Sequence, residues 1–538
     1  MSARKILGFL LAVILLLGAV AVFFPPEGLD VGPVHLRFPS LEQVLEVPDT
    51  AKVSEAAVPV LSPEQQLARM EEAFRLDRLS QLADSLDWFR EFFGQSPVSI
   101  CFPGDDPTFF DPVFEALSEA RETPVHIMHY GDSQIEQDRI TAVLRTAFQE
   151  RYGGFGPGLI PAIQALSMPN SVQEYSGDLT KYTIYGPATM RADHRRYGPM
   201  GLVCEVRDSA HISLQPRYRN RQNSSGQFTH IRVLYGHNSE GFRAELALEG
   251  GPSVREQSDS TEFGLMEWQL DRPVRELELA FYGDADIYGL SLESENGVQV
   301  DNISMRGCSG TVFTSIDEKA LRETLHRFNV RLIILQFGGN RMPSIQEQKD
   351  IDLYARQIGR QLRFFHRLAP EARLLFVGPS DMSVSVDGEL VTYPMLEPTV
   401  EALRAVCLEN NTAFWDMYRV MGGRNSMVEW VKAQPPMAAA DHVHFTVKGA
   451  RHMAQLLRQS LEACDDYHRF RQQHLNDSIM QEIQQLDRTH DYARELEEIL
   501  ESCAAASPDG SPADSTGFCP ADSIGPDDLQ DEEGEGLL

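Results

Sequence analysis

The stretch Val125-His126-Ile127-Met128-His129-Tyr130-Gly131-Asp132-Ser133 decides the fold of this 538-residue chain. Its first six residues are mostly apolar and run into a glycine, which predicts a buried β-strand that ends in a tight turn. A helical pattern follows from Gln134 to about Arg151. Ser133 is therefore expected on a strand-to-helix turn, with its backbone N–H at a helix N-terminus where negative charge is favoured.

Two further short motifs lie beside predicted elements of the same kind. Gly338-Gly339-Asn340 directly follows a buried-type strand at Val330 to Phe337. Asp441-His442-Val443-His444 precedes a helix predicted from Lys448 to about Leu461. Because open α/β sheets place their sites at the carboxyl ends of the strands, the three motifs are expected to meet at one edge of a parallel sheet.

The residue types in these motifs match the parts of a serine nucleophile site. A serine hydroxyl is a poor nucleophile at neutral pH and needs an adjacent base, and His444 is expected to take the Ser133 proton and return it. Asp441 is expected to hold the imidazole in the right tautomer. His442 is the rival base, but the three-residue spacing from Asp441 favours His444.

The oxyanion formed by such an attack needs hydrogen-bond donors. The candidates are the Ser133 N–H, the Asn340 side-chain amide and a backbone N–H at Gly310. Gly307 is a competing choice, because both glycines lie in Arg306-Gly-Cys-Ser-Gly-Thr311.

Together these blocks resemble the SGNH (GDSL-type) hydrolases, a family of esterases and deacetylases named for its Ser, Gly, Asn and His blocks. The matching segments are Gly-Asp-Ser-Gln at 131–134, Ser309-Gly310, Gly338-Gly339-Asn340 and Asp441 to His444. Gln134 stands where the family motif has Leu, a difference expected to affect helix packing and not the nucleophile. The resemblance covers about 124–166 and 300–462, and it implies a three-layer α/β/α domain with a parallel sheet that needs no metal ion or organic cofactor.

The middle of the chain has a different pattern. From about Ser167 to Asn302, short β-rich runs separated by turn residues predict an all-β sandwich inserted between the nucleophile and glycine blocks. An SGNH domain split in this way resembles the bacterial peptidoglycan O-acetylesterases, which implies an acetylated glycan as substrate. Two interpretations of the insert remain open: it binds glycan, or it only shapes a wall of the cleft.

The N-terminus carries an apolar run of 19 residues, Ile6 to Phe24, after Arg4 and Lys5. This run is long enough to span a membrane, and the preceding positive charge favours a cytoplasmic N-terminus. It predicts a single-pass anchor in the bacterial inner membrane, with the catalytic part in the periplasm. The alternative is a signal cleaved near Ala19-Val20-Ala21, with secretion to the periplasm.

These features divide the chain into consecutive segments. The predicted segments are a signal anchor (1–25), a linker and N-terminal helix (26–96), the first part of the catalytic domain (97–166), the β-sandwich insert (167–302), the second part of the catalytic domain (303–464), a C-terminal helix (465–506) and a disordered acidic tail (507–538).

The net charge of −31 argues against nucleic acid as a partner. The seven cysteines show no C-x-x-C pair, so no zinc site is indicated.

The function predicted first is a membrane-anchored serine esterase that removes O-acetyl groups from a cell-envelope glycan, with peptidoglycan as the favoured substrate. One alternative is an O-acetyltransferase that works with a membrane-bound acetyl-transfer partner, and another is a glycan-binding protein without catalysis.

Overall fold

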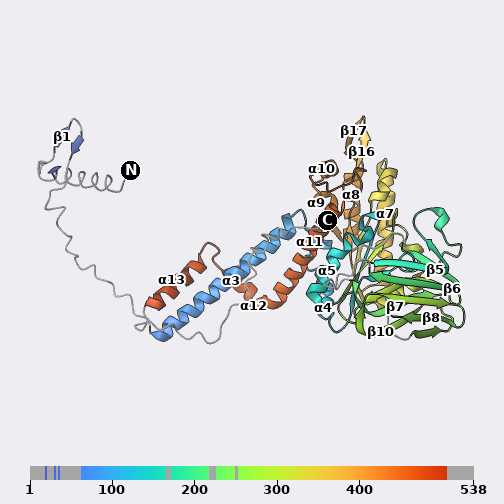
Figure 1. Cartoon of the computed structure of the whole chain (residues 1–538). Helices are drawn as coiled ribbons and strands as arrows, with labels where there is room; N and C mark the ends of the chain where they lie inside the picture. The colour runs from blue at the N-terminus through green and yellow to red at the C-terminus, as the bar shows by residue number, and fades with distance from the viewer. Residues whose placement is uncertain are drawn as a thin grey trace. The chain divides into compact units, whose positions relative to one another are not determined.

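The computed structural model describes residues 19–20, 29–31, 34–36, 62–164, 171–216, 226–248 and 253–505 (Figure 1). The predicted anchor (except residues 19–20), most of the linker and the acidic tail lie outside these ranges. Within the described residues, no helix is both long enough and apolar enough to cross a membrane.

Contacts divide the chain into two units, Gln81–Leu486 and a smaller one made of Met1–Ser80 and Asp487–Leu538. The described part of the smaller unit holds the short paired strands β1 (Leu29–Val31) and β2 (Val34–Leu36), the beginning of α3 (Pro63–Gln95), and α13 (Tyr492–Ala505). Ala73 of α3 packs there against Leu496 and Ile499 of α13.

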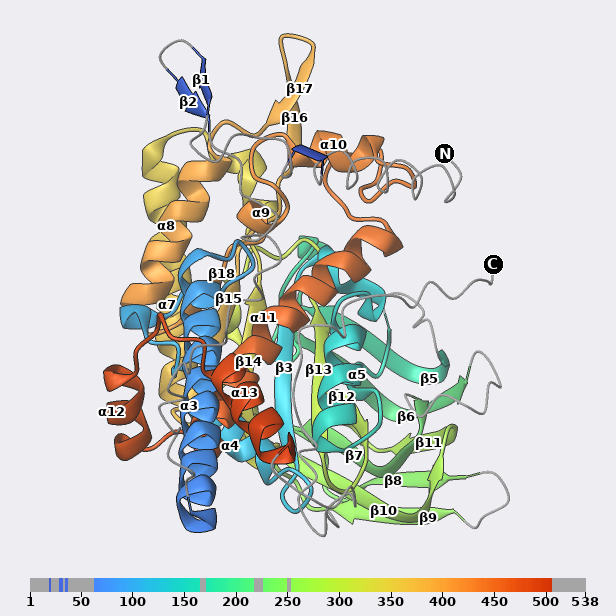
Figure 2. The ribbon, with the colours of Figure 1, turned by 90° about the vertical axis from the view of Figure 1, so that its left-hand side faces the viewer.

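A parallel sheet forms the centre of the larger unit. Its spatial order is β13–β3–β14–β15–β18, and each neighbouring pair is parallel. Figure 2 shows β3 between β13 and β14. The first strand in the chain therefore lies between the second and the third, which puts the topological switch point between β3 and β14. The strands are β3 (Val125–Gly131), β13 (Val298–Ser304), β14 (Val330–Gln336), β15 (Arg373–Val377) and β18 (Ala413–Trp415).

Alternate side chains of β3 enter two different apolar cores. Val125 and Ile127 belong to a core that includes α4, α5 and α11, whereas Met128 and Tyr130 belong to one that includes α6, α7 and α8. The expected three-layer α/β/α arrangement follows from this alternation. The helices are α4 (Asp111–Ser118), α5 (Thr141–Tyr152), α6 (Glu318–Arg327), α7 (Gln348–Leu368), α8 (Leu396–Glu409) and α11 (Val447–His474).

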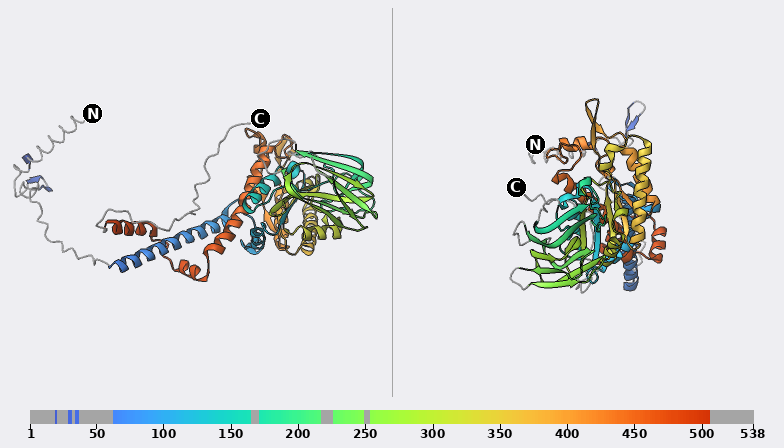
Figure 3. Two further views of the ribbon diagram at one scale, coloured as in Figure 1. Left: turned by 60° about the horizontal axis from the view of Figure 1, so that its bottom comes forward. Right: turned by 90° about the vertical axis from the view of Figure 1, so that its right-hand side faces the viewer.

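The predicted insert is a β-rich region in which antiparallel pairing joins nine described strands into one sheet (Figure 3). β6 belongs to both halves of that sheet, because residues 204–206 pair with β12 and residues 209–214 pair with β11. Pairing among the described residues is therefore continuous through β6, which links the two halves of the β-rich region. The strands are β4 (Gly158–Ile160), β5 (Ser171–Thr183), β6 (Leu202–Pro216), β7 (Phe228–Gly236), β8 (Phe242–Ala247), β9 (Val254–Ser258), β10 (Gly264–Val274), β11 (Leu277–Tyr282) and β12 (Ala285–Glu293).

The structure also moves both predicted boundaries of the insert. β4 precedes Ser167 but pairs with β12 of the β-rich sheet. β13 begins before Asn302 but pairs with β3 in the parallel sheet. Buried parallel strands are usually recognised as continuous apolar runs. β13 contains polar residues such as Asp301, so the sequence pattern did not identify it as a strand of the buried sheet.

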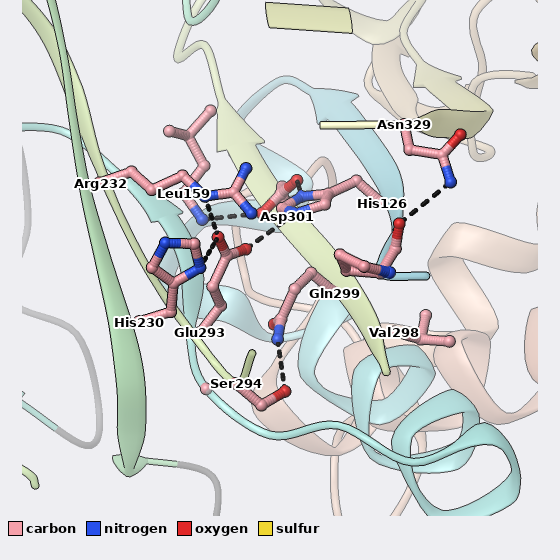
Figure 4. Close-up of polar contacts among 12 residues, drawn as sticks. His126, Leu159, His230, Arg232, Glu293, Ser294, Val298, Gln299, Asp301 and Asn329 are labelled. Atoms are coloured by element: carbon pink, nitrogen blue, oxygen red, sulfur yellow. Dashed lines mark hydrogen bonds and ion pairs between the residues drawn. The ribbon is translucent and has the colours of Figure 1, made fainter. Parts of the chain in front are cut away.

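A buried ion network joins the β-rich sheet to the parallel sheet (Figure 4). His126 of β3 lies between two carboxylates, with Nδ1 2.8 Å from Asp301 Oδ2 of β13 and Nε2 2.8 Å from Glu293 Oε2 of β12. Arg232 of β7 approaches the same Glu293 at 2.8 Å. One apolar core also contains residues of both sheets. The β-rich region is thus built into the larger unit and does not form a separate core.

Two helix predictions need correction. The helix expected from Gln134 begins at Thr141, because residues 133–138 form a short 3₁₀ segment in which Gln137 and Asp138 have φ of 57° and 63°. The single C-terminal helix expected over 465–506 is instead the end of α11, α12 (Asp477–Gln485) and α13. Asn476 accounts for the first break, since its side chain accepts a hydrogen bond from the Ile479 N–H and caps α12.

Candidate active site

The nucleophile turn follows the carboxyl end of β3. Gly131 closes the strand where a Cβ atom would lie 2.9 Å from the Ile135 side chain, so the close approach requires glycine. Asp132 caps the turn by accepting a hydrogen bond from the Gln134 N–H at 2.9 Å. Ser133 comes next and is 8% exposed, at the start of the 3₁₀ segment.

The structure brings Ser133, His444 and Asp441 together in the order expected for a triad. Ser133 Oγ lies 2.9 Å from His444 Nε2, and His444 Nδ1 lies 2.7 Å from Asp441 Oδ2. These distances let the serine donate to Nε2 while the Nδ1–H donates to the carboxylate. The serine and the histidine are 311 residues apart in the chain, so only the tertiary structure makes this pair.

Asp441 is held as a carboxylate. Burial alone would raise its pKa, but hydrogen bonds from the His444 backbone, the His444 ring and the Val443 backbone outweigh burial and leave the pKa below its ordinary value. The two backbone N–H groups both donate to Oδ1 at 3.0 Å, which leaves Oδ2 to the imidazole. A charged Asp441 can stabilise the imidazolium that forms during attack.

The rival base, His442, has a different environment. Its φ is 56°, and its backbone carbonyl accepts a hydrogen bond from the Ser383 N–H at 3.1 Å. Its buried Nδ1 has no hydrogen-bond partner among the described residues. The geometry therefore favours His444 as the base.

Asn340, the oxyanion candidate from the β14 loop, lies beside the nucleophile turn. Its Nδ2 donates to Asp132 Oδ2 at 3.0 Å and to the Cys308 carbonyl at 3.2 Å. Both hydrogens of this amide thus have acceptors, and donation to an oxyanion would need one of the two bonds to open.

The two candidate glycines differ in their surroundings. The Gly310 N–H donates to Cys308 Sγ at 3.3 Å, and Gly310 is buried against Phe337. Gly307 is exposed, and a Cβ atom there would meet no atom within 4 Å. Neither glycine lines the cavity beside Ser133 and His444.

That cavity has a volume of about 200 Å³. Beyond the reacting side chains, its wall is largely apolar, with a polar contribution from Gln336 at the end of β14. The other lining residues include Gln134, Phe337, Pro343, Met382, Tyr393 and Met417. A site of this size suits a small acyl group better than a long chain.

Gln134 has a role that the sequence interpretation missed. We expected this departure from Leu to affect only helix packing, and that expectation is wrong. Its side chain instead hydrogen-bonds the backbone of Val443 and Phe445, on either side of the candidate base. The amide in place of an apolar side chain was the available signal, but its partner could not be seen without the fold.

His129 supports the same region from inside β3. Its Nε2 lies 3.1 Å from Gln336 Oε1, and its Nδ1 lies 3.0 Å from the Thr141 hydroxyl. Burial lowers the pKa of His129 to about 4, although the Gln336 contact opposes this shift. His129 is therefore a neutral hydrogen-bonding residue that links the cavity lining to α5.

One group of side chains among the described residues has ligand spacing for a metal ion, namely His194, Glu205 and Asp286. Its hydrogen bonding does not fit a metal. The backbone N–H of Arg196 donates to His194 Nδ1, so the ring proton is on Nε2. That nitrogen lies 2.6 Å from Glu205 Oε1 and donates to it. Arg196 also pairs with Asp286. The group is an ion-pair network in which the histidine nitrogen is not free to bind a cation.

The GDSL-like lipase/acylhydrolase family matches residues 280–452, which include the Asn340, Asp441 and His444 motifs. Ser133 lies outside the matched residues, on the other side of the β-rich region. No curated protein matches the chain.

Several of the solved structures that match the chain are described as esterases. A peptidoglycan O-acetylesterase matches with a TM-score of 0.55 and 19% identity, over 68% of this chain and 97% of that one. A family two carbohydrate esterase from Cellvibrio japonicus has a TM-score of 0.22 and 11% identity, over 55% and 99% of the two chains. An acetyl xylan esterase has a TM-score of 0.23 and 13% identity, over 30% and 81%.

The family match covers the Asn and His blocks, and the larger unit has the expected parallel sheet with a β-rich region. The chain therefore contains a GDSL/SGNH hydrolase domain and is an enzyme of the esterase class, with a fold that resembles a peptidoglycan O-acetylesterase.

Proposed function

We propose that this protein removes O-acetyl groups from a cell-envelope glycan, with peptidoglycan as the substrate, through a Ser–His–Asp acyl-enzyme mechanism. The observation that carries the proposal is the continuous hydrogen-bonded line from Ser133 Oγ through His444 to Asp441 Oδ2. The similarity to a peptidoglycan O-acetylesterase supports the choice of glycan.

In the first half-reaction, Ser133 Oγ attacks the acetyl carbonyl carbon while its proton passes to His444 Nε2. The carbonyl oxygen becomes an oxyanion that the Ser133 N–H and the Asn340 amide stabilise. Collapse breaks the bond to the sugar oxygen, which takes the proton from His444 and leaves as a free hydroxyl. The products are the deacetylated sugar and an acetyl-serine.

In the second half-reaction, water attacks the acetyl-serine carbonyl and gives a proton to His444 Nε2. Collapse returns the proton to Ser133 Oγ and releases acetic acid, which ionises in solution to acetate and a proton, so atoms and charge balance over the cycle. Asp441 stays ionised throughout and stabilises the imidazolium in both halves.

Solvent access favours hydrolysis over acetyl transfer. The side chains of His444 and Asp441 are 40% and 50% exposed, so water can reach the base. A transferase must keep water away from its acyl-enzyme until the acceptor sugar arrives. The assembled Ser133–His444 pair also argues against a glycan-binding protein without catalysis.

We further propose that the protein is exported and held at the bacterial inner membrane by Ile6 to Phe24, with the catalytic domain in the periplasm. The length of that apolar run and the preceding basic residues support this location. Fractionation tests it: release by detergent but not by high salt is expected, whereas a mature N-terminus near Val22 would favour the secreted form.

The catalytic proposal is tested with a chromogenic acetate ester and with O-acetylated peptidoglycan. Ser133→Ala and His444→Ala should each lower kcat by at least about 10³-fold, whereas His442→Ala should cost far less. Ser380→Ala is the matched control, because Ser380 lines the same cavity.

Retention of substantial turnover by Ser133→Ala would reject the nucleophile, and a larger loss for His442→Ala than for His444→Ala would reject the base. An acceptor sugar added to the assay distinguishes hydrolysis from transfer. Acetate release at an unchanged rate supports the esterase, and acetylation of the sugar in its place would establish the transferase.

A further inference from the structure

The candidate base is carried by a loop rather than by a helix or strand. His444 lies between Asp441 and α11, in a segment without regular secondary structure, and its side chain is 40% exposed. Proton transfer depends on the 2.9 Å distance between Ser133 Oγ and His444 Nε2. Because misplacement of about 1 Å can cost about 10²-fold in rate, something must hold this loop against the nucleophile turn.

The side chain of Gln134 makes that connection. Its Nε2 donates to the Val443 carbonyl at 2.8 Å, and its Oε1 accepts from the Phe445 N–H at 3.3 Å. The amide thus pairs with the backbone on both sides of His444, as a neighbouring β-strand would. Gln134 itself is the residue after Ser133 and is 8% exposed. Gln134 therefore links the base to the nucleophile through bonds on both sides of His444.

Arg139 ties the same two segments together. Its guanidinium donates to the Ser133 carbonyl at 2.5 Å and to the Phe445 carbonyl at 3.2 Å. A third bond, to the Glu136 carbonyl at 3.0 Å, fixes the guanidinium on its own turn. The loop is therefore bound by two side chains that both come from the nucleophile turn.

An apolar side chain cannot replace this contact. With Leu or Met at position 134, the Phe445 N–H would lose the one acceptor that the described structure gives it, in a residue only 2% exposed. A buried donor without a partner is costly, so the loop would shift to find water or another acceptor. Such a shift would move His444 away from Ser133.

We propose that Gln134 is a positioning residue that holds His444 in register with Ser133, so that the amide in place of the family's Leu sets the efficiency of proton transfer. This inference rests on the proposed Ser–His–Asp mechanism. It assigns Gln134 no contact with the reacting atoms.

The test is a double-mutant cycle between Gln134→Met and His444→Ala, assayed with the chromogenic acetate ester. Met matches the length of Gln and removes both hydrogen bonds. Gln134→Met alone should lower kcat by about 10- to 100-fold with KM changed less than about threefold, because both polar atoms of the Gln134 amide bond the loop of the base and not the ester. In the His444→Ala background it should change the residual rate less than about twofold, because its effect passes through His444.

Gln149→Met is the matched control. The Gln149 amide also bonds backbone carbonyls, those of Gly156 and Val298, but it lies on α5 and does not line the cavity. This variant should keep kcat within about twofold of wild type. Thermal melts of all variants separate misplacement from unfolding.

Two results would overturn the inference. One is a kcat for folded Gln134→Met within about twofold of wild type. The other is an equal relative decrease in rate when Gln134→Met is made in the wild-type and in the His444→Ala background. If Gln134→Met does not fold, Gln134→Glu replaces it, since the carboxylate can accept from Phe445 but repels the Val443 carbonyl. A tenfold or greater loss in kcat then supports positioning, and an unchanged kcat rejects it. An inactive Gln134→Met beside a fully active His444→Ala would instead refute the proposed mechanism.

Discussion

Asn340 donates its side-chain N–H to the carboxylate of Asp132, the residue before the nucleophile, across 3.0 Å. The other oxygen of the same carboxylate accepts the Gln134 N–H. Asp132 therefore orients two different parts of the site, the nucleophile turn and the oxyanion candidate. Because a carboxylate only accepts, it also fixes Asn340 with nitrogen rather than oxygen facing the turn.

Asn340→Ala should lower kcat by about 10²- to 10³-fold with little change in KM, because the amide acts on the oxyanion and not on the bound ester. Initial rates with an acetate ester measure this. Asn410→Ala is the control, since its side chain caps the end of α8 through the Val406 carbonyl. A loss of less than about fivefold for Asn340→Ala would remove Asn340 from the oxyanion hole.

Protonation of Asp132 should stabilise the fold. Burial raises the pKa of Asp132 to about 6, although hydrogen bonds from Gln134 and Asn340 and the charge of His444 oppose the shift. The folded pKa exceeds the unfolded value of about 3.9, so the folded state binds more protons between these values and stability falls as pH rises from about 4 to 6. The contribution is roughly 3 kcal/mol.

Urea unfolding of wild type and Asp132→Asn at pH 4, 5, 6 and 7 isolates this contribution, because all other groups titrate in both proteins. The stability of wild type relative to the variant should decline by a few kcal/mol over that range. A constant difference across the four pH values would show that Asp132 is ionised with an ordinary pKa.

His126 should stabilise the folded state at neutral pH and lose this effect at high pH. Burial alone lowers its pKa, but the adjacent Asp301 and Glu293 carboxylates outweigh burial and raise it to about 9. A raised histidine pKa gives stability that is complete below the unfolded value of about 6.5 and is lost as pH rises through about 9.

His126→Leu should destabilise the protein by about 3–5 kcal/mol at pH 6, because two buried carboxylates lose the cation between them. The difference from wild type should shrink at pH 10. His211→Leu is the control, since His211 lies 3.8 Å from Glu278 with its side chain 42% exposed. An equal loss at pH 6 and pH 10 would mean that His126 is neutral in the fold.

Gly310 and Gly307 offer a matched pair, with φ of 75° and 77°. Alanine at either position would have to adopt a left-handed backbone conformation, which lowers the stability of the fold by about 1–2 kcal/mol. At Gly310 the added Cβ would also lie 2.8 Å from Phe337 Cγ, whereas at Gly307 it meets nothing within 4 Å. Gly310→Ala should therefore be less stable than Gly307→Ala by a further 1–3 kcal/mol or so in urea unfolding, and equal values would contradict the packing described for Gly310.

The strands of the parallel sheet were predictable because buried strands are continuous apolar runs. The expected strand at Val330 to Phe337 corresponds to β14, and the one at Val125 to Tyr130 corresponds to β3. β13 was not recognised as their neighbour, because Gln299, Asp301 and Asn302 interrupt its apolar pattern. The partners of those polar groups lie elsewhere in the chain, such as His126 for Asp301, Phe155 for Gln299 and Thr141 for Asn302, and no local pattern contains them.

The sequence alone determined which residues could do the chemistry, since the order and spacing of the Gly-Asp-Ser, Gly-Gly-Asn and Asp-x-x-His motifs are local properties of the chain. The tertiary structure decided how they act together. Only the fold sets Ser133 against His444, gives both hydrogens of the Asn340 amide to Asp132 and Cys308, and turns Gln134 toward the loop of the base. Hydrogen bonds between residues hundreds of positions apart depend on sheet order and packing, and these are properties of the whole chain.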